Sequence, residues 1–559
     1  MVTGDKAMKL LTRILTVVAL VLAAHGTAHA QKSWNVTSGL WNTGTNWSPA
    51  AVPVAGDAVV IANGGTASLD TSSSGLTSLT IGSTSLLQKD NSGTGRTLTG
   101  TATSGLITNS GTIRYGQGAN GVFAIRSGSS GWNNSGLITA DVASRMLSIE
   151  TNAAGVDIVN TGTIQANSGT MRFTSGGTSF DFMNAAGVVR AINNGTLQMT
   201  KGPRMTGGSV SIEAGSTWFH NSPNDSTDFT DVTVVNAGRM YFDQTSSNRM
   251  NFNIFGSTSF TNSGTFEVLA SSAGTLNPNI YATTSATSTI TNQATGIIRI
   301  ALNMTAGTGT AYFQNSTSNF TNAGRIEIFS NLGLTTGSSQ FRSSGVNLSN
   351  AGSFLVDGPI SSIEMGARTF TQTAGALSLV NGGRMTAGSV LINSGTLLGT
   401  GTINAPVTIG GILSPGSGGI GTLSVSNGVT WNAGNAWTFE LGTAAASLAA
   451  ADTGSTGDLL ALAGAFTQGT GTTFTFDFVN SGTDGWYKLV DYASTTFATG
   501  ANASFAATNL PVGKSANFVV DSTTTALYVQ IVPEPGAIAL AAVGAAAAGL
   551  VWRKRRRDR

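Results

Sequence analysis

The chain has 559 residues, of which 73 are glycine, none is cysteine and only 10 % are charged. The lack of cysteine excludes disulfides and thiolate chemistry. The formal charge of +2 is misleading, because basic residues gather at both ends and residues 31–533 carry 19 basic against 23 acidic residues. Residues 31–533 therefore have a net charge of about −4, which would repel the phosphates of nucleic acid, so we expect no nucleic-acid partner.

Residues 1–30 have the three parts of a secretory signal peptide. Lys9 and Arg13 form its basic region, an apolar stretch comes next, and Ala28-His29-Ala30 is a small-Xaa-small cleavage site before Gln31. The apolar stretch is too short to be a transmembrane helix. We therefore predict export, with signal peptidase acting between Ala30 and Gln31.

Residues 31–100 differ in composition from the repeats after residue 100, because Trp34, Trp41 and Trp47 come close together there. The open end of a stacked β-structure needs a cover, since an exposed edge strand would pair with other chains. Three tryptophans supply bulky apolar area for such a cover. We interpret residues 31–100 as an N-terminal cap with the first turns of a stack. A sugar-stacking platform is the alternative.

A short pattern recurs twelve times between residues 106 and 397. An apolar residue precedes an Asn by two positions, one or two small residues and a Gly come after the Asn, and apolar residues stand two and often four positions later, as in Ile107-Thr-Asn109-Ser-Gly111-Thr-Ile113. Such a period marks a repeat architecture. The twelve glycines, spaced 20 to 32 residues apart, are Gly111, Gly136, Gly162, Gly187, Gly215, Gly238, Gly264, Gly296, Gly324, Gly352, Gly375 and Gly395.

Each copy of the pattern predicts a strand, a corner and a second strand. Apolar residues at every second position bury one face of a strand, and Asn and Gly tolerate the positive φ of a tight corner. Hairpins in a row of sandwich domains would need about 100 residues per domain, whereas a unit of about 25 residues must stack on its neighbours. We predict an all-β fold, a right-handed parallel β-solenoid of about 12 or more rungs over residues 101–430, with almost no helix between residues 31 and 531. Three copies are the weakest: those with Gly187 and Gly296 carry an extra residue or two before the Gly, and the one with Gly215 has Glu213 where Asn is expected.

The end of the repeats carries a more specific pattern. It includes Leu398-Gly399-Thr-Gly401-Thr-Ile403, Gly411-Ile-Leu413-Ser-Pro415-Gly416 and Gly421-Thr-Leu423-Ser-Val425. This pattern resembles the repeat of autotransporter passenger domains, which are secreted β-helices. Residues 431–531, a C-terminal β region, are similar in order to the closing part of such passengers.

The last segment, residues 532–559, has three parts. Val532-Pro533-Glu534-Pro535 comes first, an uncharged run rich in Ala, Gly, Val and Leu reaches Trp552, and the basic cluster Arg553-Lys554-Arg555-Arg556-Arg557 comes last. This order resembles the PEP-CTERM sorting signal, which implies processing by an exosortase-like membrane protease and an association with exopolysaccharide. The uncharged run is at the short end of what spans a bilayer, and the basic cluster would keep the C-terminus in the cytoplasm. A permanent single-span anchor is the alternative.

Residues able to carry chemistry are few. His220 is the only histidine after residue 30, and a lone histidine in a repeat is expected on the surface. Zinc sites and Ser-His-Asp nucleophiles are therefore disfavoured. Asp225, Asp228 and Asp231 form the densest acidic group, and we interpret them as a solvated loop, with loose Ca²⁺ binding as the alternative. We predict no catalytic residue, no metal site and no cofactor.

These observations predict an exported, non-catalytic cell-surface or extracellular-matrix protein with a structural or adhesive role. We expect it at the cell envelope, anchored in the membrane before processing, and then at the surface or in the matrix. The alternative is a β-helix enzyme, a lyase or hydrolase, that cleaves polysaccharide with carboxylates alone. A groove that gathers several carboxylates and basic residues would favour the enzyme.

Overall fold

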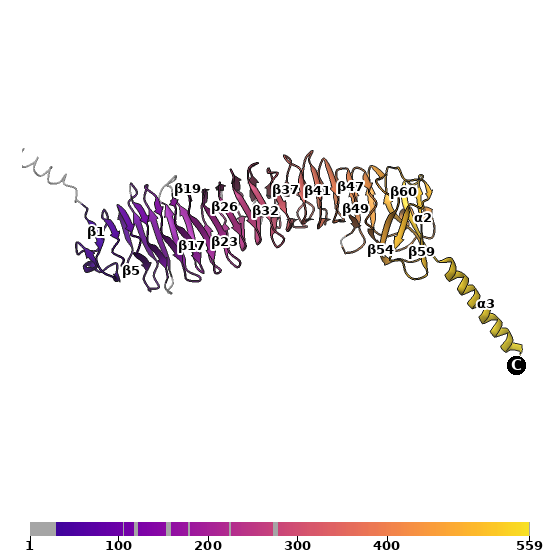
Figure 1. Cartoon of the computed structure of the whole chain (residues 1–559), viewed down its shortest axis with the longest axis horizontal. Coiled ribbons are helices and arrows are strands. Elements are labelled where there is room, and N and C mark those ends of the chain that lie inside the picture. Colours follow the sequence, from indigo (N-terminus) through magenta and orange to yellow (C-terminus); the bar gives the residue numbers. More distant parts are fainter. Residues whose placement is uncertain are drawn as a thin grey trace, which may run out of the picture. The chain divides into compact units, whose positions relative to one another are not determined.

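The computed structural model describes residues 29–557 except 104, 117–120, 152–157, 177–178, 223–224, 272–277 and 417. Strands make up most of the described chain (Figure 1). The chain divides into two compact units, residues 1–180 and 181–559.

Each turn of the chain contributes three strands, and most strands pair in parallel with the strand three places later. Thus β10 pairs in parallel with β13, β11 with β14, and β12 with β15. The three strands of a turn belong to three different sheets, which we call faces A, B and C in chain order. This parallel coil confirms the predicted all-β solenoid, and its turns exceed the twelve repeats seen in the sequence.

The strands of the first unit are distributed over the three faces. Face A contains β1 (Gln31–Trp34), β3 (Trp47–Ser48), β4 (Ala58–Ile61), β7 (Ser78–Ile81), β10 (Leu106–Asn109), β13 (Trp132–Asn134) and β16 (Ile158–Asn160). Face B contains β2 (Ser38–Leu40), β5 (Thr66–Leu69), β8 (Leu86–Lys89), β11 (Thr112–Tyr115), β14 (Leu137–Ala140) and β17 (Thr163–Asn167). Face C contains β6 (Ser73–Leu76), β9 (Arg96–Gly100), β12 (Val122–Ser127), β15 (Met146–Thr151) and β18 (Thr170–Ser175).

The second unit repeats this arrangement. Face A contains β19 (Ser179–Met183), which begins just before the boundary, β22 (Gly202–Thr206), β25 (Ser226–Thr230), β28 (Arg249–Phe255), β31 (Asn279–Thr284), β34 (Thr310–Gln314), β37 (Ser338–Arg342), β40 (Ser361–Glu364), β43 (Arg384–Thr386), β46 (Thr402–Asn404), β49 (Thr422–Val425), β52 (Leu459–Leu462) and β55 (Gly485–Asp491). Face B contains β20 (Val188–Ile192), β23 (Ser209–Ile212), β26 (Thr233–Asn236), β29 (Ser259–Asn262), β32 (Thr289–Asn292) and β35 (Phe320–Asn322), and then, as a separate sheet, β38 (Leu348–Asn350), β41 (Thr369–Gln372), β44 (Ser389–Ile392), β47 (Val407–Ile409), β50 (Val429–Trp431), β53 (Ala465–Gln468) and β56 (Ser494–Thr495).

Face C of the second unit is also made of two successive sheets. The first contains β21 (Thr196–Met199), β24 (Thr217–His220), β27 (Arg239–Gln244), β30 (Thr265–Ala270), β33 (Ile297–Leu302), β36 (Arg325–Ser330), β39 (Ser353–Asp357), β42 (Ala376–Val380), β45 (Thr396–Gly399) and β48 (Ile412–Pro415). The second contains β51 (Trp437–Leu441), β54 (Phe474–Ser481) and β58 (Phe505–Thr508).

The core is built by the alternation seen in the sequence. Ile113, Ile138 and Ile164 occupy the same place on β11, β14 and β17, and all three are fully buried. Full burial of one such side chain contributes about 1.5–3 kcal/mol. The inward positions of successive turns therefore form continuous apolar columns.

Several corner residues have other roles than the positive φ that the sequence predicted. Asn109 and Asn134 end their strands without a positive φ, and their side chains are buried. Gly136 also lacks a positive φ, but a Cβ there would lie 2.1 Å from the carbonyl oxygen of Gly111. The predicted positive φ is found at three of the twelve pattern glycines, Gly215, Gly375 and Gly395, and the asparagines and the other corners have a different reason. Asn is required for its buried amide, and Gly for the close stacking of successive corners.

The buried asparagines form hydrogen-bonded ladders from one turn to the next. In the first unit, Asn109 Nδ2 donates to Asn134 Oδ1 and Asn134 Nδ2 to Asn160 Oδ1, both at 2.7 Å, at the corner between faces A and B. In the second unit, each amide from Asn236 through Asn262, Asn292, Asn322 and Asn350 to Gln372 donates to the next at 2.7–2.8 Å. This second ladder lies between faces B and C, so the same sequence pattern serves two different corners. Ile212, directly before Glu213, pairs with Asn236, so an apolar side chain takes the ladder position in the copy with Gly215.

The N-terminal tryptophans pack on one another. Trp47 meets Trp34 and Trp41 edge to face, with ring centroids 4.9 and 4.8 Å apart, and its Nε1 donates to the Trp41 carbonyl at 2.8 Å. All three rings are buried. Their faces are therefore not open to a sugar, and the packing agrees with a covering role. A short 3₁₀ helix, η1 (Gly44–Asn46), lies in the same segment.

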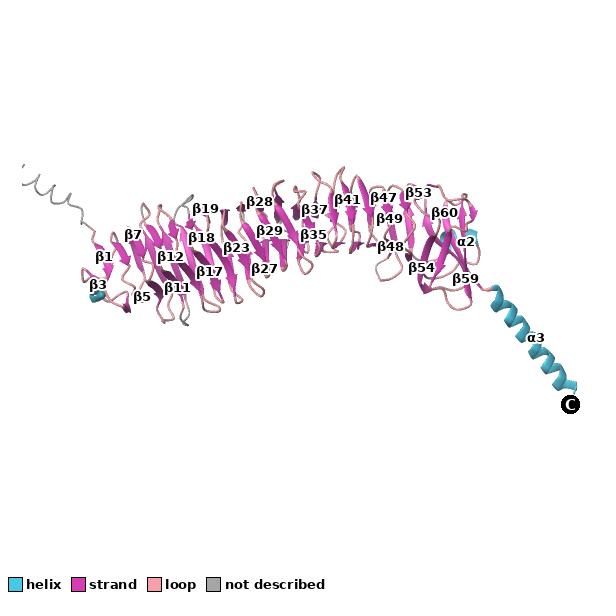
Figure 2. Ribbon diagram, in the orientation of Figure 1, coloured by secondary structure: helices cyan, strands magenta, loops and turns pink. Residues whose placement is uncertain are grey.

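The other end of the coil changes to antiparallel pairing. Strand β60 (Ala526–Pro533) lies between β55 and β59 (Lys514–Asp521), and β59 also pairs with β57 (Gly500–Ala501), all antiparallel. The described residues between 31 and 531 include one short α-helix, α2 (Leu448–Gly454), capped by the Ser447 hydroxyl, which accepts from the Ala450 N–H. A second α-helix, α3 (Pro535–Arg557), comes after β60 (Figure 2).

Candidate functional site

The C-terminal motif begins inside the sheet rather than after it. Val532 and Pro533 are the last residues of β60 and pair with Ser515 and Lys514 of β59. The Glu534 N–H donates to the Gly513 carbonyl at 2.8 Å, but its side chain is exposed. Val532 and Pro533 are half-buried, so Glu534 offers the most accessible side chain between the strand and α3.

Helix α3 starts at Pro535, where the missing N–H of proline costs nothing. Near its end, Leu550, Val551 and Trp552 are each about 60 % exposed or more, and the Arg556 guanidinium lies 4.6 Å from the centre of the Trp552 ring. Arg553, Lys554, Arg555 and Arg556 are exposed, and Arg557 ends the helix. In the described part of the chain, we find no helix whose length and apolar character would suit a membrane span, so the predicted transmembrane segment is not confirmed.

The predicted signal-peptide cleavage site lies at the edge of the described residues. Residues 1–28, which include Ala28 and all but the last two residues of the signal peptide, fall outside them. Ala30 is described, and Gln31 begins β1 with an exposed side chain. Cleavage between Ala30 and Gln31 would leave the first strand whole. That cleavage stays a prediction.

His220 was predicted on the surface, and this prediction is wrong. It is the last residue of β24 and is fully buried. Its Nδ1 lies 2.9 Å from the Thr227 hydroxyl, while Nε2 has no hydrogen-bond partner among the described residues. Burial lowers its pKa to about 3. The period-2 alternation of β24 turns this imidazole inward, so it has no contact with solvent.

The three aspartates predicted as a solvated loop are instead spread along strand β25 and its flanks. Asp225 is buried and accepts from the Ser222 hydroxyl at 2.6 Å, and burial raises its pKa. Asp228 lies within the strand and accepts from Asn253 at 2.7 Å. Asp231 is exposed. Among the described residues, no group of three or more His, Asp or Glu side chains is placed to hold a metal ion.

Glutamates on face C are held in ion pairs with arginines of the same or neighbouring turns. In the first unit, Glu150 pairs with Arg126 at 2.6 Å and with Arg172 at 3.0 Å. In the second unit, a longer row of alternating charges runs over β27, β30, β33 and β36. Its contacts are Arg239 Nε–Glu267 Oε2 at 2.5 Å, Arg299 Nη1–Glu267 Oε1 at 2.6 Å, Arg299 Nε–Glu327 Oε2 at 2.7 Å and Arg325 Nε–Glu327 Oε1 at 3.0 Å. Carboxylates bound in this way are not free to act as an acid and a base.

Asp458 is a buried carboxylate that closes a loop. Its two oxygens accept the backbone N–H groups of Gly421 and Glu440, each at 2.8 Å. Burial nevertheless raises its pKa to about 6. Both oxygens are used in backbone bonds, so the group stabilises the local fold.

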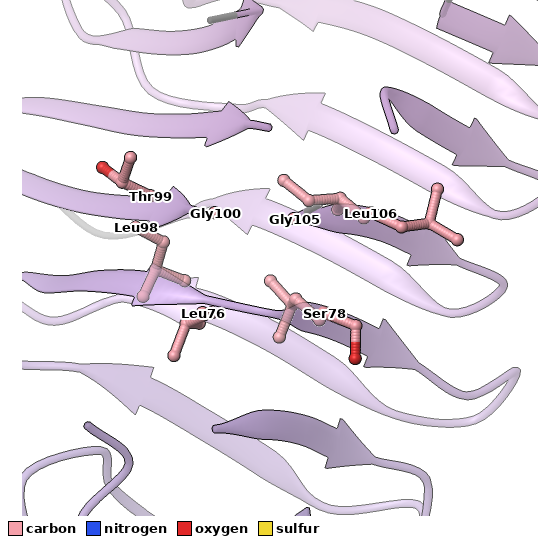
Figure 3. Close-up of a pocket in the computed structure, with 9 residues that line it drawn as sticks. Leu76, Ser78, Leu98, Thr99, Gly100, Gly105 and Leu106 are labelled. Atoms are coloured by element: carbon pink, nitrogen blue, oxygen red, sulfur yellow. The ribbon is translucent and has the colours of Figure 1, made fainter. Parts of the chain in front are cut away.

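One hollow in the described residues is apolar and small, about 10 Å³. It lies between turns, lined by Leu76, Leu98 and Leu106 with the backbone of Gly100 and Gly105 (Figure 3). A space of this size holds at most one water molecule. It is a packing defect rather than a ligand site.

One surface feature was missed from the sequence. Tyr281 and Tyr312 occupy equivalent places on β31 and β34, and their rings stack with centroids 4.3 Å apart. Arg249 and Arg342 lie against the outer faces of this pair. In the sequence, each of these tyrosines stands two residues after the first residue of its strand, β31 or β34. This correspondence becomes visible only once the two strands are aligned.

Comparison with known proteins bears on the C-terminal segment. A family model described as the PEP-CTERM protein-sorting motif matches residues 532–557. No curated protein matches the chain. The matched residues include the end of β60, the exposed Glu534 and the whole of α3. The chain therefore carries a PEP-CTERM protein-sorting motif at its C-terminus, which indicates an extracellular protein sorted by exosortase-type machinery.

Proposed function

We propose that this protein is a non-catalytic structural or adhesive component of the cell surface or extracellular matrix, associated with exopolysaccharide. The observation that carries the proposal is the sorting motif joined to the end of a β-solenoid. The strands of the solenoid present many Ser, Thr and Asn side chains at their outward positions. Such faces suit repeated hydrogen bonding to a polymer rather than enclosure of a small substrate.

The role of the tail is explained by the order of its parts. Residues 537–552 carry no charged side chain, and the basic cluster resists translocation after them. Leu550, Val551 and Trp552 are exposed apolar side chains that a membrane would cover. We infer that the precursor is held at the membrane by this tail and is cut by an exosortase-like protease between Val532 and Pro535.

A polysaccharide-cleaving enzyme has less support. Catalysis by two carboxylates needs one of them free as a base and one protonated as an acid. Glu150, Glu267 and Glu327 each accept from two arginines, and His220 is buried. No observation on the described residues favours the enzyme over the structural role.

The test is the C-terminus of the mature protein. Mass spectrometry of protein released from cells should find an end between Val532 and Pro535. The variant Glu534→Ala removes the exposed carboxylate of the motif and keeps the backbone bond to Gly513. It should therefore fold, but it should escape the protease, keep its tail and stay with the membrane fraction. Val512→Ala, at a fully exposed site nearby, is the matched control and should be processed normally. If mature wild-type protein still ends at Arg559, the tail is a permanent anchor and the processing proposal fails.

A further inference from the structure

The outer surface of face A carries a row of side chains across four adjacent strands of the second unit. In the register of β28, β31, β34 and β37, Asn251, Tyr281, Tyr312 and Gln340 lie side by side. The outer strands, β28 and β37, are labelled in Figure 2. Neighbouring strands are about 4.8 Å apart, so the row extends for roughly 14 Å.

Within this row, two arginines and two tyrosines form one continuous stack. The Arg249 guanidinium lies 4.5 Å from the centre of the Tyr281 ring, and the Arg342 guanidinium lies 4.4 Å from that of Tyr312. The two rings stack on each other at 4.3 Å. We call Arg249, Tyr281, Tyr312 and Arg342 the Arg–Tyr row.

The guanidinium groups are held in place by neighbouring amides. Arg249 Nε donates to Asn251 Oδ1 at 2.8 Å, and Arg342 Nε donates to Gln340 Oε1 at 2.7 Å. Each guanidinium is thus fixed by a ring face on one side and an amide at its edge. Little conformational entropy remains to be lost when it binds a further group.

Neither guanidinium is neutralised by a carboxylate. Within the described chain, no Asp or Glu oxygen forms an ion pair with Arg249 or Arg342. Glu364 is the register neighbour of Arg342 on β40, yet the two form no ion pair. Arg239 on face C provides the contrast, because it stacks on Tyr241 at 4.0 Å but also bonds Glu267 at 2.5 Å.

We propose that the Arg–Tyr row binds an acidic polysaccharide, with carboxylates of the polymer paired to Arg249 and Arg342. Planar guanidinium groups bind carboxylates in a bidentate manner. Neutral sugars usually stack on open aromatic faces, but each ring here is covered by its partner tyrosine on one face and a guanidinium on the other. Between the arginines, the tyrosine hydroxyls and the amides of Asn251 and Gln340 offer hydrogen bonds to the polymer. This inference names the partner class of the proposed function and rests on it.

The test uses the complete mature protein. Isothermal titration calorimetry measures its binding to polygalacturonate, and dextran serves as the neutral control polymer. Wild-type protein should bind polygalacturonate, more weakly as salt rises, and should not bind dextran. The double variant Arg249→Gln/Arg342→Gln should bind at least tenfold more weakly. Arg239→Gln, which alters a stacked but paired arginine, should bind as wild type does.

Three results would overturn the inference: no binding of polygalacturonate by wild type, equal binding of dextran, or unchanged affinity in the double variant. Circular dichroism of each variant shows whether the fold is kept. The sorting proposal is judged separately by the mature C-terminus. A correctly processed protein with no polygalacturonate affinity would reject the binding site and leave the sorting role standing.

Discussion

Burial shifts the protonation equilibria of two titratable side chains in this protein, whatever their residue type. His220 and Asp458 are both buried, and burial shifts the pKa of each toward its neutral form. For His220 the pKa falls to about 3, and for Asp458 it rises to about 6. Neither side chain is accessible to solvent, so neither can react with a solute. Both make the stability of their turn depend on pH.

His220 should make its turn less stable in acid. Between about pH 6.5 and pH 3 the unfolded chain binds a proton that the folded chain excludes, so the free energy of unfolding falls as the pH falls. At pH 5 the loss should be on the order of 2 kcal/mol. The measurement is hydrogen exchange of the β24 amides at pH 7.5 and pH 5, corrected for intrinsic rates.

The variant His220→Phe isolates this effect, because it keeps an aromatic ring in the core and removes the titration. Its β24 protection should show about 2 kcal/mol less pH dependence than wild type. Asp458 changes stability with pH in the opposite direction, because burial raises its pKa. Both proteins contain Asp458, so its contribution cancels when their pH dependences are subtracted. The same pH dependence in both proteins would show that His220 is not the titrating group.

At the scale of the element, the corner is the part that specifies the stack. Apolar columns would tolerate a slip of two residues, but a buried amide must meet another amide in the next turn. Asn292 shows the arrangement, because its Nδ2 donates to Asn322 Oδ1 and also to the carbonyls of Gly296 and Arg325. The ladder therefore ties side chains and backbone of adjacent turns together.

Asn292→Ala should destabilise the second unit by about 1–3 kcal/mol, because buried acceptors lose their donor. The matched control is Asn319→Ala, since Asn319 is exposed on the segment just before β35. Thermal unfolding and exchange of the β32 and β35 amides report the difference. Equal effects of the two substitutions would mean that the buried ladder adds nothing beyond ordinary packing.

At the scale of the whole molecule, the sorting tail and the folded body share a strand. Strand β60 pairs with both β55 and β59, and Leu527, Val529 and Ile531 on it are fully or nearly fully buried. The body therefore extends to Pro533, where the sorting motif has already begun. Processing at the Pro535 end of the proposed range would remove α3 and leave this strand intact.

Two truncations should separate folding from sorting. A chain ending at Glu534 keeps all of β60 and should resist protease like wild type, although it lacks the tail proposed to hold the precursor at the membrane. A chain ending at Thr525 loses β60, and each of its buried apolar side chains contributes about 1.5–3 kcal/mol, so the region from β55 onward should be digested. Limited proteolysis and mass spectrometry of the fragments measure both. Digestion of the chain ending at Glu534 would mean that α3 is needed for folding.

The sequence alone determined the strand period, the parallel coil and the three-part tail, because each depends on residues close together in the chain. Alternating apolar residues define a strand wherever they occur, and the spacing of Asn-Xaa-Gly shows that the unit is too short to fold alone. The tertiary structure decided the rest. The asparagine ladders and the Arg–Tyr row join residues about 22 to 32 positions apart, which only stacking of the turns makes neighbours. The burial of His220 likewise depends on which strand positions turn inward, and the predicted surface role failed because that register was not visible in the sequence.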